Sequence, residues 1–209
     1  MNYSKIEKKW QNAWEKEQIY QVDENSKKPK FYCLSMYPYP SGSGLHIGHA
    51  SNFSITDVFS RFKRMQGFNV LHPMGFDSFG LPAENAAIKN NSHPRLFTEK
   101  AIKNFIRQMK ELGLSYDWSR MIYSHDPNYY KWNQWLFLQM FKKGLAYKKT
   151  APVNWCSECN TVLANEQVVN GCCWRHEDKE VEIKELNQWF YKTTDYAKDL
   201  VKELEKLDW

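Results

Sequence analysis

The sequence lacks any run of 18 or more apolar residues, and its first residues lead directly into a polar helical pattern. The lack of an apolar run excludes a membrane-spanning helix. The polar helical pattern at the start gives no sign of a secretory signal peptide. Internal repeats and low-complexity tracts are lacking as well. We therefore expect a cytoplasmic globular protein with no membrane partner.

What is present fits one large domain, or one domain with an appendage. The 209 residues are 42% hydrophobic and 25% charged, which is ordinary for a globular protein. The formal net charge of +5 permits a polyanionic partner such as RNA without requiring one. Aromatic residues reach 16%. Their usual place is a large core, and stacking on bases is a less common use.

Residues 31–75 have the pattern of a strand, a Gly-rich turn, a helix and a second strand. The apolar segment 31–36 predicts the first strand, and residues 69–73 predict the second. The helix between them is indicated by apolar residues at helical spacing, and Gly67 is placed to end it. These apolar residues are Ile55, Val58, Phe59, Phe62 and Met65. The order predicts the βαβ unit of a parallel α/β sheet.

Four further helices are expected. An N-terminal amphipathic helix has Ser4 and Glu7 as a capping-box pattern. Two later stripes, both expected to face the core, end at Gly113 and Gly144. They consist of Ile102, Phe105, Ile106, Met109 and Leu112, and of Trp135, Leu138 and Phe141. A last amphipathic helix carries Ala197, Leu200, Val201, Leu204 and Leu207 to the final residue.

The turn before the first βαβ helix has the character of a phosphate site. The stretch PYPSGSGLHIGH, residues 38–49, follows a strand and so lies at the carboxyl edge of the sheet, where open α/β folds bind ligands. Gly42, Gly44 and Gly48 remove Cβ atoms there. His46 and His49 share one face of the first helical turn, where the helix N-terminus favours anions. Both imidazoles could donate to phosphate oxygens during nucleotidyl transfer.

The pattern around these histidines differs from two better-known phosphate loops. It lacks the Gly-Lys-Ser/Thr end of a Walker loop and the third glycine of G-x-G-x-x-G. A metal-binding pair is the rival use for two histidines at this spacing. No acidic ligand lies nearby in the sequence to complete such a pair.

A cysteine-rich segment follows at about residues 155–176, where no helical stripe is visible. Cys156 and Cys159 form a C-x2-C pair, Cys173 and His176 form a C-x2-H pair, and thirteen residues separate the two pairs. This is the spacing of a closed four-ligand zinc site, which can hold together a segment too small to bury its own core. We therefore predict structural Zn2+, although Cys172 could take the place of Cys173.

The cysteines have two other possible uses, disulfide formation and redox chemistry. Disulfides are the alternative, but a cytoplasmic location argues against them. A redox C-x-x-C motif would need no second pair. Cys33 lies in the first predicted strand and is expected to be structural.

The residues around the histidine pair are specific enough to indicate a family. His46-Ile47-Gly48-His49 after a strand resembles the HIGH motif of class I aminoacyl-tRNA synthetases, and the flanking residues resemble the leucyl-tRNA synthetases within that class. The segments that carry this likeness are YCLSMYPYPSG (32–42), GFDSFGLPAE (75–84), YDWSR (116–120), VNWC (153–156) and TVLANEQV (161–168). The resemblance spans essentially the whole chain.

Two residues of the second segment bear on the choice within the class. Phe79 favours leucine over the isoleucyl and valyl enzymes, which usually have His at this place. Phe76 stands where Trp is common, which exchanges one flat apolar ring for another and should not change the chemistry.

The resemblance implies a leucine–tRNA ligase that uses ATP and Mg2+ to form leucyl-adenylate and then transfers the leucyl group to the acceptor end of tRNA(Leu). His46 and His49 would bind the ATP phosphates and stabilise the transition state, and Gly44 and Gly48 would shape the nucleotide site. Asp77 would pair with the ammonium of leucine, and Met36 and Tyr39 would line its side chain. Read without the family, Asp77 could cap the helix near Pro82, and Met36 could be strand core.

The fold implied is α/β, the N-terminal half of a class I synthetase Rossmann-like parallel sheet with flanking helices plus a small zinc-binding insertion. We assign 1–150 to the nucleotide-binding half, 151–184 to the zinc module and 185–209 to a return helix leading toward an editing insertion. No KMSKS-like segment, the second class I motif, is present. We therefore expect an N-terminal piece that needs the C-terminal remainder of the synthetase as partner.

Two other classes of function remain open. A non-catalytic RNA-binding paralogue would keep the basic surface but need not keep both histidines together with Asp77. A structural zinc module would need only the segment from Cys156 to His176. The intact first motif disfavours both.

Overall fold

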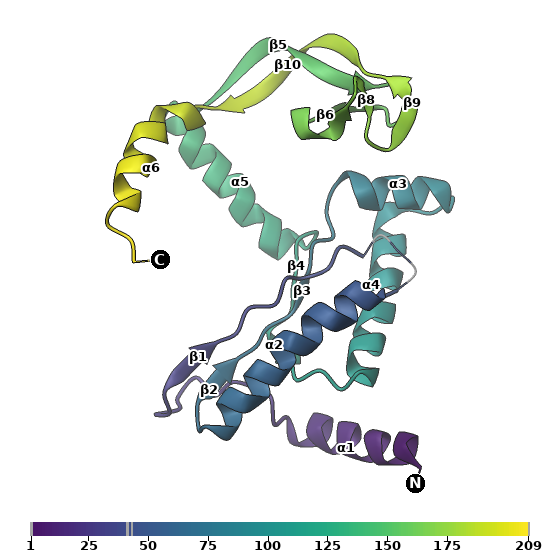
Figure 1. Cartoon of the computed structure of the whole chain (residues 1–209), viewed down its shortest axis with the longest axis vertical. Helices are drawn as coiled ribbons and strands as arrows, with labels where there is room; N and C mark the ends of the chain where they lie inside the picture. Colours follow the sequence, from purple (N-terminus) through teal and green to yellow (C-terminus); the bar gives the residue numbers. More distant parts are fainter. Residues whose placement is uncertain (1, 41, 43, 209) are drawn as a thin grey trace. The chain divides into compact units, whose positions relative to one another are not determined.

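The structure is a computed structural model that describes residues 2–40, 42 and 44–208 (Figure 1). Contacts between Cα atoms divide the chain into two compact units, Met1–Lys131 and Trp132–Trp209. The division falls inside helix α5 (Pro127–Lys142). Among the described residues, no helix combines the length and the apolar character that crossing a membrane requires.

The first unit contains the predicted βαβ unit. Strand β1 (Lys30–Tyr32) pairs in parallel with β2 (Asn69–Leu71), and helix α2 (Ile47–Met65) connects them. A second parallel pair follows, in which β3 (Gly75–Phe76) pairs with β4 (Ile122–Tyr123). Parallel strands bring their carboxyl ends to one edge. A site is therefore expected among the residues that follow β1, β3 and β4.

The first strand is shorter than predicted. The expected segment was 31–36, but the ladder ends at Tyr32, and the N–H of Cys33 donates the last bond to the Leu71 carbonyl at 2.9 Å. The described residues between Cys33 and α2 form no further strand. Pro38 and Pro40 follow, and neither has an N–H to continue a ladder. Cys33 is buried, as expected of a structural residue.

Three more helices belong to the first unit. They are α1 (Tyr3–Glu17), α3 (Leu81–Lys89) and α4 (Pro94–Glu111), and a short 3-10 turn (Trp118–Arg120) precedes β4. The cap of α1 differs from the prediction: Asn2, not Ser4, accepts from the N–H of Lys5 at 3.1 Å. The helix therefore begins one residue before Ser4, which places that serine inside it.

Glycines end helices α2 and α4, as predicted. Gly67 follows the C-cap of α2 with φ +87°, and Gly113 follows the C-cap of α4 with φ +75°. This left-handed conformation favours glycine because it has no Cβ.

The core of the first unit lies between the parallel strands and helices α2 and α4. It confirms the predicted inward stripe of α4 at Ile102, Phe105 and Met109, whereas Leu112 is half-exposed. The buried cluster consists of Phe53, Met74, Phe76, Ile102, Phe105, Met109, Leu114 and Tyr116.

The second unit is built on a long antiparallel ribbon. Strand β5 (Ala146–Cys156) pairs with β10 (Glu182–Tyr191) along ten residues of each strand, and β6 (Thr161–Leu163) pairs with the end of β5. Three short strands form a separate small sheet, β7 (Val168–Val169), β8 (Cys172–Cys173) and β9 (His176–Glu180). A short 3-10 turn (Asn165–Gln167) lies between β6 and β7.

The unit ends in a 3-10 turn (Thr193–Tyr196) and helix α6 (Ala197–Leu204). The final helix is therefore shorter than predicted, since it stops before Leu207.

The predicted core stripe of α5 is wrong. Trp135, Leu138 and Phe141 are each about half exposed, and no described residue of α5 is buried. The spacing is helical, as predicted, and the helix forms. Periodicity shows that a helix has an apolar face, but it does not show whether that face is covered.

Candidate functional site

The two histidines of the HIGH-like motif lie against each other at the start of α2. His46 is the N-cap, and its Nδ1 accepts from the His49 N–H at 3.3 Å, while His49 Nδ1 accepts from the His46 N–H at 3.3 Å. The two rings stack with centroids 3.7 Å apart. Because both Nδ1 atoms accept, each neutral ring carries its proton on Nε2. The pair thus presents two N–H donors beside a helix N-terminus.

The protonation of His49 suits this role. Burial, with a smaller contribution from His46, lowers the pKa of His49 below its ordinary value. Its ring packs on Phe53 at 5.6 Å and against Phe105 at 5.9 Å between centroids. The ring is therefore fixed by the core and is neutral at physiological pH, with Nδ1 as acceptor and Nε2–H as donor.

The glycines of the turn serve close packing inside the protein. A Cβ at Gly44 would come within 2.6 Å of Gln108 Oε1, and that same amide oxygen accepts from the Leu45 N–H at 2.8 Å. A Cβ at Gly48 would lie 3.1 Å from the His46 ring. Gly44 thus lets the turn rest on α4, and Gly48 lets His46 fold onto His49. The expected nucleotide roles of both glycines stay predictions.

Asp77 follows β3 and is exposed. Its N–H donates to the Pro38 carbonyl at 3.1 Å, which joins the end of β3 to the segment that carries Met36 and Tyr39. Its charge contributes to raising the pKa of Tyr39, after burial. Asp77 does not cap α3. The N-cap of that helix is Gly80, and no side chain forms a capping hydrogen bond there.

The two residues expected to line a leucine side chain differ in their surroundings. Met36 is 74% exposed, so it is not strand core. Tyr39 is half-buried, and its hydroxyl donates to the Phe79 carbonyl at 2.9 Å and accepts from the Ala83 N–H at 3.3 Å. Tyr39 therefore fixes the loop between β3 and α3, while Met36 presents an open apolar surface.

Sequence reasoning missed a polar group at the end of β4. Ser124 and His125 follow this strand and contact Asp77 and Ser78, which follow β3. The available signal was weak: a short apolar pair, Ile122–Tyr123, is followed by polar residues. Only the pairing of β3 with β4 shows that these residues meet.

A buried polar network includes Ser35, in the segment between β1 and Met36. Ser35 Oγ lies 2.6 Å from Thr56 Oγ1 and 3.1 Å from His72 Nε2, and the Tyr116 hydroxyl donates to Ser35 Oγ at 3.3 Å. Burial lowers the pKa of His72 to about 4 and raises the pKa of Tyr116. Both groups are therefore uncharged at neutral pH.

The predicted metal ligands converge in the second unit. The ligand atoms of Cys156, Cys159, Cys173 and His176 all lie within 4.8 Å of one another. Cys159 Sγ is 3.7 Å from Cys173 Sγ and 3.4 Å from His176 Nδ1, and Cys156 Sγ is 3.8 Å from the same nitrogen. Cys173 joins this group and Cys172 does not. The sulfur separation excludes a Cys159–Cys173 disulfide.

These separations fit a tetrahedral ion. Zinc–sulfur bonds of about 2.3 Å and zinc–nitrogen bonds of about 2.0 Å place tetrahedral ligand atoms roughly 3.4–3.8 Å apart. Burial opposes ionisation of Cys173, but hydrogen bonds from the Arg175 backbone and the His176 ring lower the pKa of its thiol to about 6. Three thiols and an imidazole are a donor set that zinc prefers. The cluster could therefore hold a metal ion.

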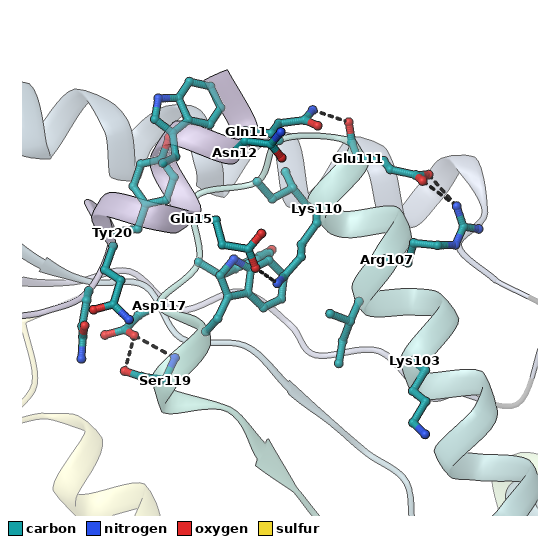
Figure 2. A pocket seen from close by; sticks show the side chains of 18 residues that line it. Gln11, Asn12, Glu15, Tyr20, Lys103, Arg107, Lys110, Glu111, Asp117 and Ser119 are labelled. Atoms are coloured by element: carbon teal, nitrogen blue, oxygen red, sulfur yellow. Dashed lines mark hydrogen bonds and ion pairs between the residues drawn. The ribbon is translucent and has the colours of Figure 1, made fainter. Parts of the chain in front are cut away.

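A cavity of about 510 Å3 lies between α1 and the C-terminal half of α4 (Figure 2). At its rim, the Gln11 amide donates to the Glu111 carbonyl at 2.9 Å, and Lys110 pairs with Glu15. No described residue of α1 is buried. None of the sequence-predicted site residues lines this cavity. The cavity is therefore separate from the candidate site at the strand ends.

Comparison with known proteins identifies the family. The profile described as tRNA synthetases class I (I, L, M and V) matches residues 9–209. A leucine–tRNA ligase of Fusobacterium nucleatum is 57% identical over 98% of this chain, and one of Symbiobacterium thermophilum is 54% identical over 99%. The chain spans about a quarter of the length of these curated relatives, 24% in both cases.

Solved structures agree with this result. The ternary complex of Agrobacterium radiobacter K84 agnB2 LeuRS with tRNA and LeuAMS matches 97% of this chain and 26% of that protein, with a TM-score of 0.87 and 43% identity. A Mycobacterium tuberculosis methionyl-tRNA synthetase bound to methionyl-adenylate has a TM-score of 0.69 at 21% identity over 85% of this chain, which supports the fold alone. The predicted fold class is confirmed. The chain therefore belongs to the class I tRNA synthetases of the isoleucine, leucine, methionine and valine group.

Proposed function

We propose that this chain is the part of a leucine–tRNA ligase that binds ATP and leucine during formation of leucyl-adenylate. The observation that carries the proposal is the identity of 54–57% to leucine–tRNA ligases along nearly the whole chain. The full activity, with transfer of the leucyl group to tRNA(Leu), belongs to a longer polypeptide of which the chain would form about a quarter.

The histidine pair would act on ATP. In the reaction a leucine carboxylate oxygen attacks the α-phosphorus, and pyrophosphate leaves. Negative charge shifts onto the phosphate oxygens as the bond to the leaving group breaks. The Nε2–H groups of His46 and His49, together with the N-terminus of α2, are donors suited to that charge. Mg2+ would share the charge of the phosphates when ATP is bound.

The end of β3 and the segment before it would hold leucine. Asp77 offers a carboxylate, which would form a charge-assisted hydrogen bond with the ammonium group of leucine. Met36 supplies an exposed thioether, and Tyr39 a ring whose hydroxyl is already engaged with the backbone. An apolar wall of this kind suits a branched aliphatic side chain.

The cysteine cluster would hold one structural Zn2+. Its four ligand atoms form a closed set, with no vacant position for a substrate. Only Cys156, Leu163 and Cys173 form a buried cluster there among the described residues. So small a core would need a metal to be stable.

The remainder of the synthetase would complete the site. The chain has no KMSKS-like segment, so the phosphates would lack their second set of donors. The described strands pair β1 only with β2, which leaves one edge of β1 for another strand. We therefore expect the chain alone to be nearly inactive in leucine activation, because charge on the transferring group must be met from several sides.

The test is leucine-dependent ATP–pyrophosphate exchange by a complete enzyme in which this chain replaces the corresponding segment of a leucine–tRNA ligase. Leucine, isoleucine, valine and methionine are offered in turn. Exchange with leucine alone supports the proposal. Exchange only with another amino acid favours an isoleucyl- or valyl-type enzyme, and no exchange with any of them favours a non-catalytic paralogue.

Two variants separate the roles within that enzyme. Asp77→Asn should raise KM for leucine about 10- to 100-fold with little change for ATP, because it removes a charged partner of the ammonium. His49→Asn should lower kcat by roughly 100-fold with little change in leucine KM. The control is His93→Asn, an exposed histidine that caps α4. Equal effects of the first two changes on leucine affinity would contradict this division.

A further inference from the structure

Asp77 and Ser124 are neighbours across two parallel strands. The register pairs Gly75 with Ile122 and Phe76 with Tyr123, so Asp77 and Ser124 come next on their strands. The ladder continues to this point, since the Ser124 N–H donates to the Phe76 carbonyl at 3.1 Å. The contact therefore depends on the pairing of the strands and not on a flexible loop.

The hydroxyl of Ser124 is aimed by the backbone. It accepts from the Ser78 N–H at 2.7 Å and donates to Asp77 Oδ1 at 3.4 Å. The Ser78 N–H points at a lone pair of Ser124 Oγ, and the hydroxyl proton of Ser124 is directed to the Asp77 carboxylate. The two bonds are therefore compatible with one orientation of the hydroxyl.

Ser78 and His125 form a second pair, which contacts Ser124 through the Ser78 N–H. Ser78 is buried, and its hydroxyl donates to the Phe76 carbonyl at 3.2 Å. Ser78 Oγ also lies 2.6 Å from His125 Nδ1. Because the hydroxyl proton of Ser78 is directed to the Phe76 carbonyl, His125 Nδ1 is the donor in this second bond. His125 therefore holds Ser78 in place, and Ser78 holds the hydroxyl of Ser124 through its N–H.

We propose that Ser124 is a positioning residue for the leucine-binding carboxylate of Asp77, with Ser78 and His125 as its support. This inference rests on the proposed function. Asp77 is exposed, so an unrestrained carboxylate would lose rotational freedom when it meets the ammonium of leucine. A neutral hydroxyl restrains one carboxylate oxygen and leaves the negative charge intact. A cationic partner at this place would compete with the ammonium.

The experiment uses the complete enzyme described above and measures KM for leucine, KM for ATP and kcat in ATP–pyrophosphate exchange. Ser124→Ala should raise leucine KM about five- to tenfold, with ATP KM and kcat within about twofold of the parent. Ser124→Thr keeps the hydroxyl and should restore leucine KM. The control is Ser92→Ala, which removes an exposed hydroxyl between α3 and α4.

A double-mutant cycle tests whether Ser124 acts through Asp77. In the Asp77→Asn background, Ser124→Ala should change leucine KM by less than about twofold. A five- to tenfold effect that persists in this background would overturn the proposal. So would a loss of kcat and of ATP affinity equal to the loss for leucine, since that is the pattern of a general structural defect.

Failure of the proposed function would look different. If Asp77→Asn left leucine affinity unchanged while the parent enzyme activated leucine, the assignment of Asp77 would fall, whatever Ser124 does. If Asp77→Asn weakened leucine and Ser124→Ala did not, only the positioning role would fall.

Discussion

Acidification should destabilise the first unit through one buried histidine. His72 is fully buried beside Ser35, and burial lowers its pKa from 6.5 to about 4. The unfolded chain takes up this proton as the pH falls through about 6.5, whereas the folded chain takes it up only near pH 4. The unfolded state therefore binds more protons between these values, and stability falls with the pH.

The size of the effect follows from the two pKa values. The difference between 6.5 and about 4, at about 1.4 kcal/mol per pH unit, amounts to about 3 kcal/mol of unfolding free energy. Above about pH 7 this group contributes no pH dependence. His49, whose pKa is also lowered by burial, adds a smaller effect of the same sign because it is less buried.

Urea unfolding at pH 7.5, 6, 5 and 4, followed by tryptophan fluorescence, measures this loss. Trp118 packs on Tyr116 at 5.6 Å between ring centroids, so it reports on the same network. The control is His72→Gln, which replaces the imidazole by an amide that can still donate and accept hydrogen bonds but does not titrate. This variant should be less stable at pH 7.5, and its unfolding free energy should fall by about 3 kcal/mol less between pH 7.5 and pH 4. An identical loss in both proteins would show that His72 is not the group responsible.

The remaining predictions concern the metal, the turn and an exposed face. Protein purified without chelator should contain about one zinc per chain by elemental analysis, and Cys173→Ser should lose it and become more sensitive to proteolysis, whereas Cys172→Ser should not. Gly44→Val should cost about 1–3 kcal/mol of stability in a thermal melt, because its Cβ would meet the amide of Gln108, and an unchanged melt would show that the turn adapts. Phe59→Asp should reduce self-association of the chain in analytical ultracentrifugation, while Lys100→Asp on the exposed face of α4 should not.

Local patterns predicted the parts of the structure that local physics determines. The βαβ unit followed from a strand, a glycine turn and a helical stripe within 45 residues, and each of these signals has its physical cause nearby in the chain. The metal ligands converge as expected because C-x2-C and C-x2-H spacings each fix two ligands on one turn. The histidine pair also folds within its own helical turn.

Contacts between distant residues were not predictable in this way. Ser124 meets Asp77 across 47 positions, and Gln108 holds the glycine turn across 63. Neither partner belongs to a motif with a recognisable spacing. Their roles depend on which strands and helices lie side by side, and one sequence gives no signal for that. The exposed stripe of α5 illustrates the same limit, since helical spacing was right and the expected burial was wrong.

The apolar face of α2 is the reason to expect self-association. Ile55, Val58, Phe59 and Phe62 repeat at helical spacing, yet each is between 47% and 69% exposed, and the buried positions of the helix are Phe53, Asp57 and Ser60. With Cys33 and Thr56 these four side chains line a shallow apolar hollow.

A helix that exposes four large apolar side chains while it buries an aspartate and a serine is costly in isolation. Asp57 is placed inward because it binds Arg61 at 2.7 Å and the Ser115 N–H at 2.5 Å, which anchors α2 to the loop before the 3-10 turn. The outward face then needs another cover, and the remainder of the synthetase would supply it in the proposed enzyme. Without that cover, large exposed apolar patches promote association between copies. A charge at Phe59, which lines the hollow, should therefore keep the chain monomeric, and association that persists in Phe59→Asp would place the associating surface elsewhere.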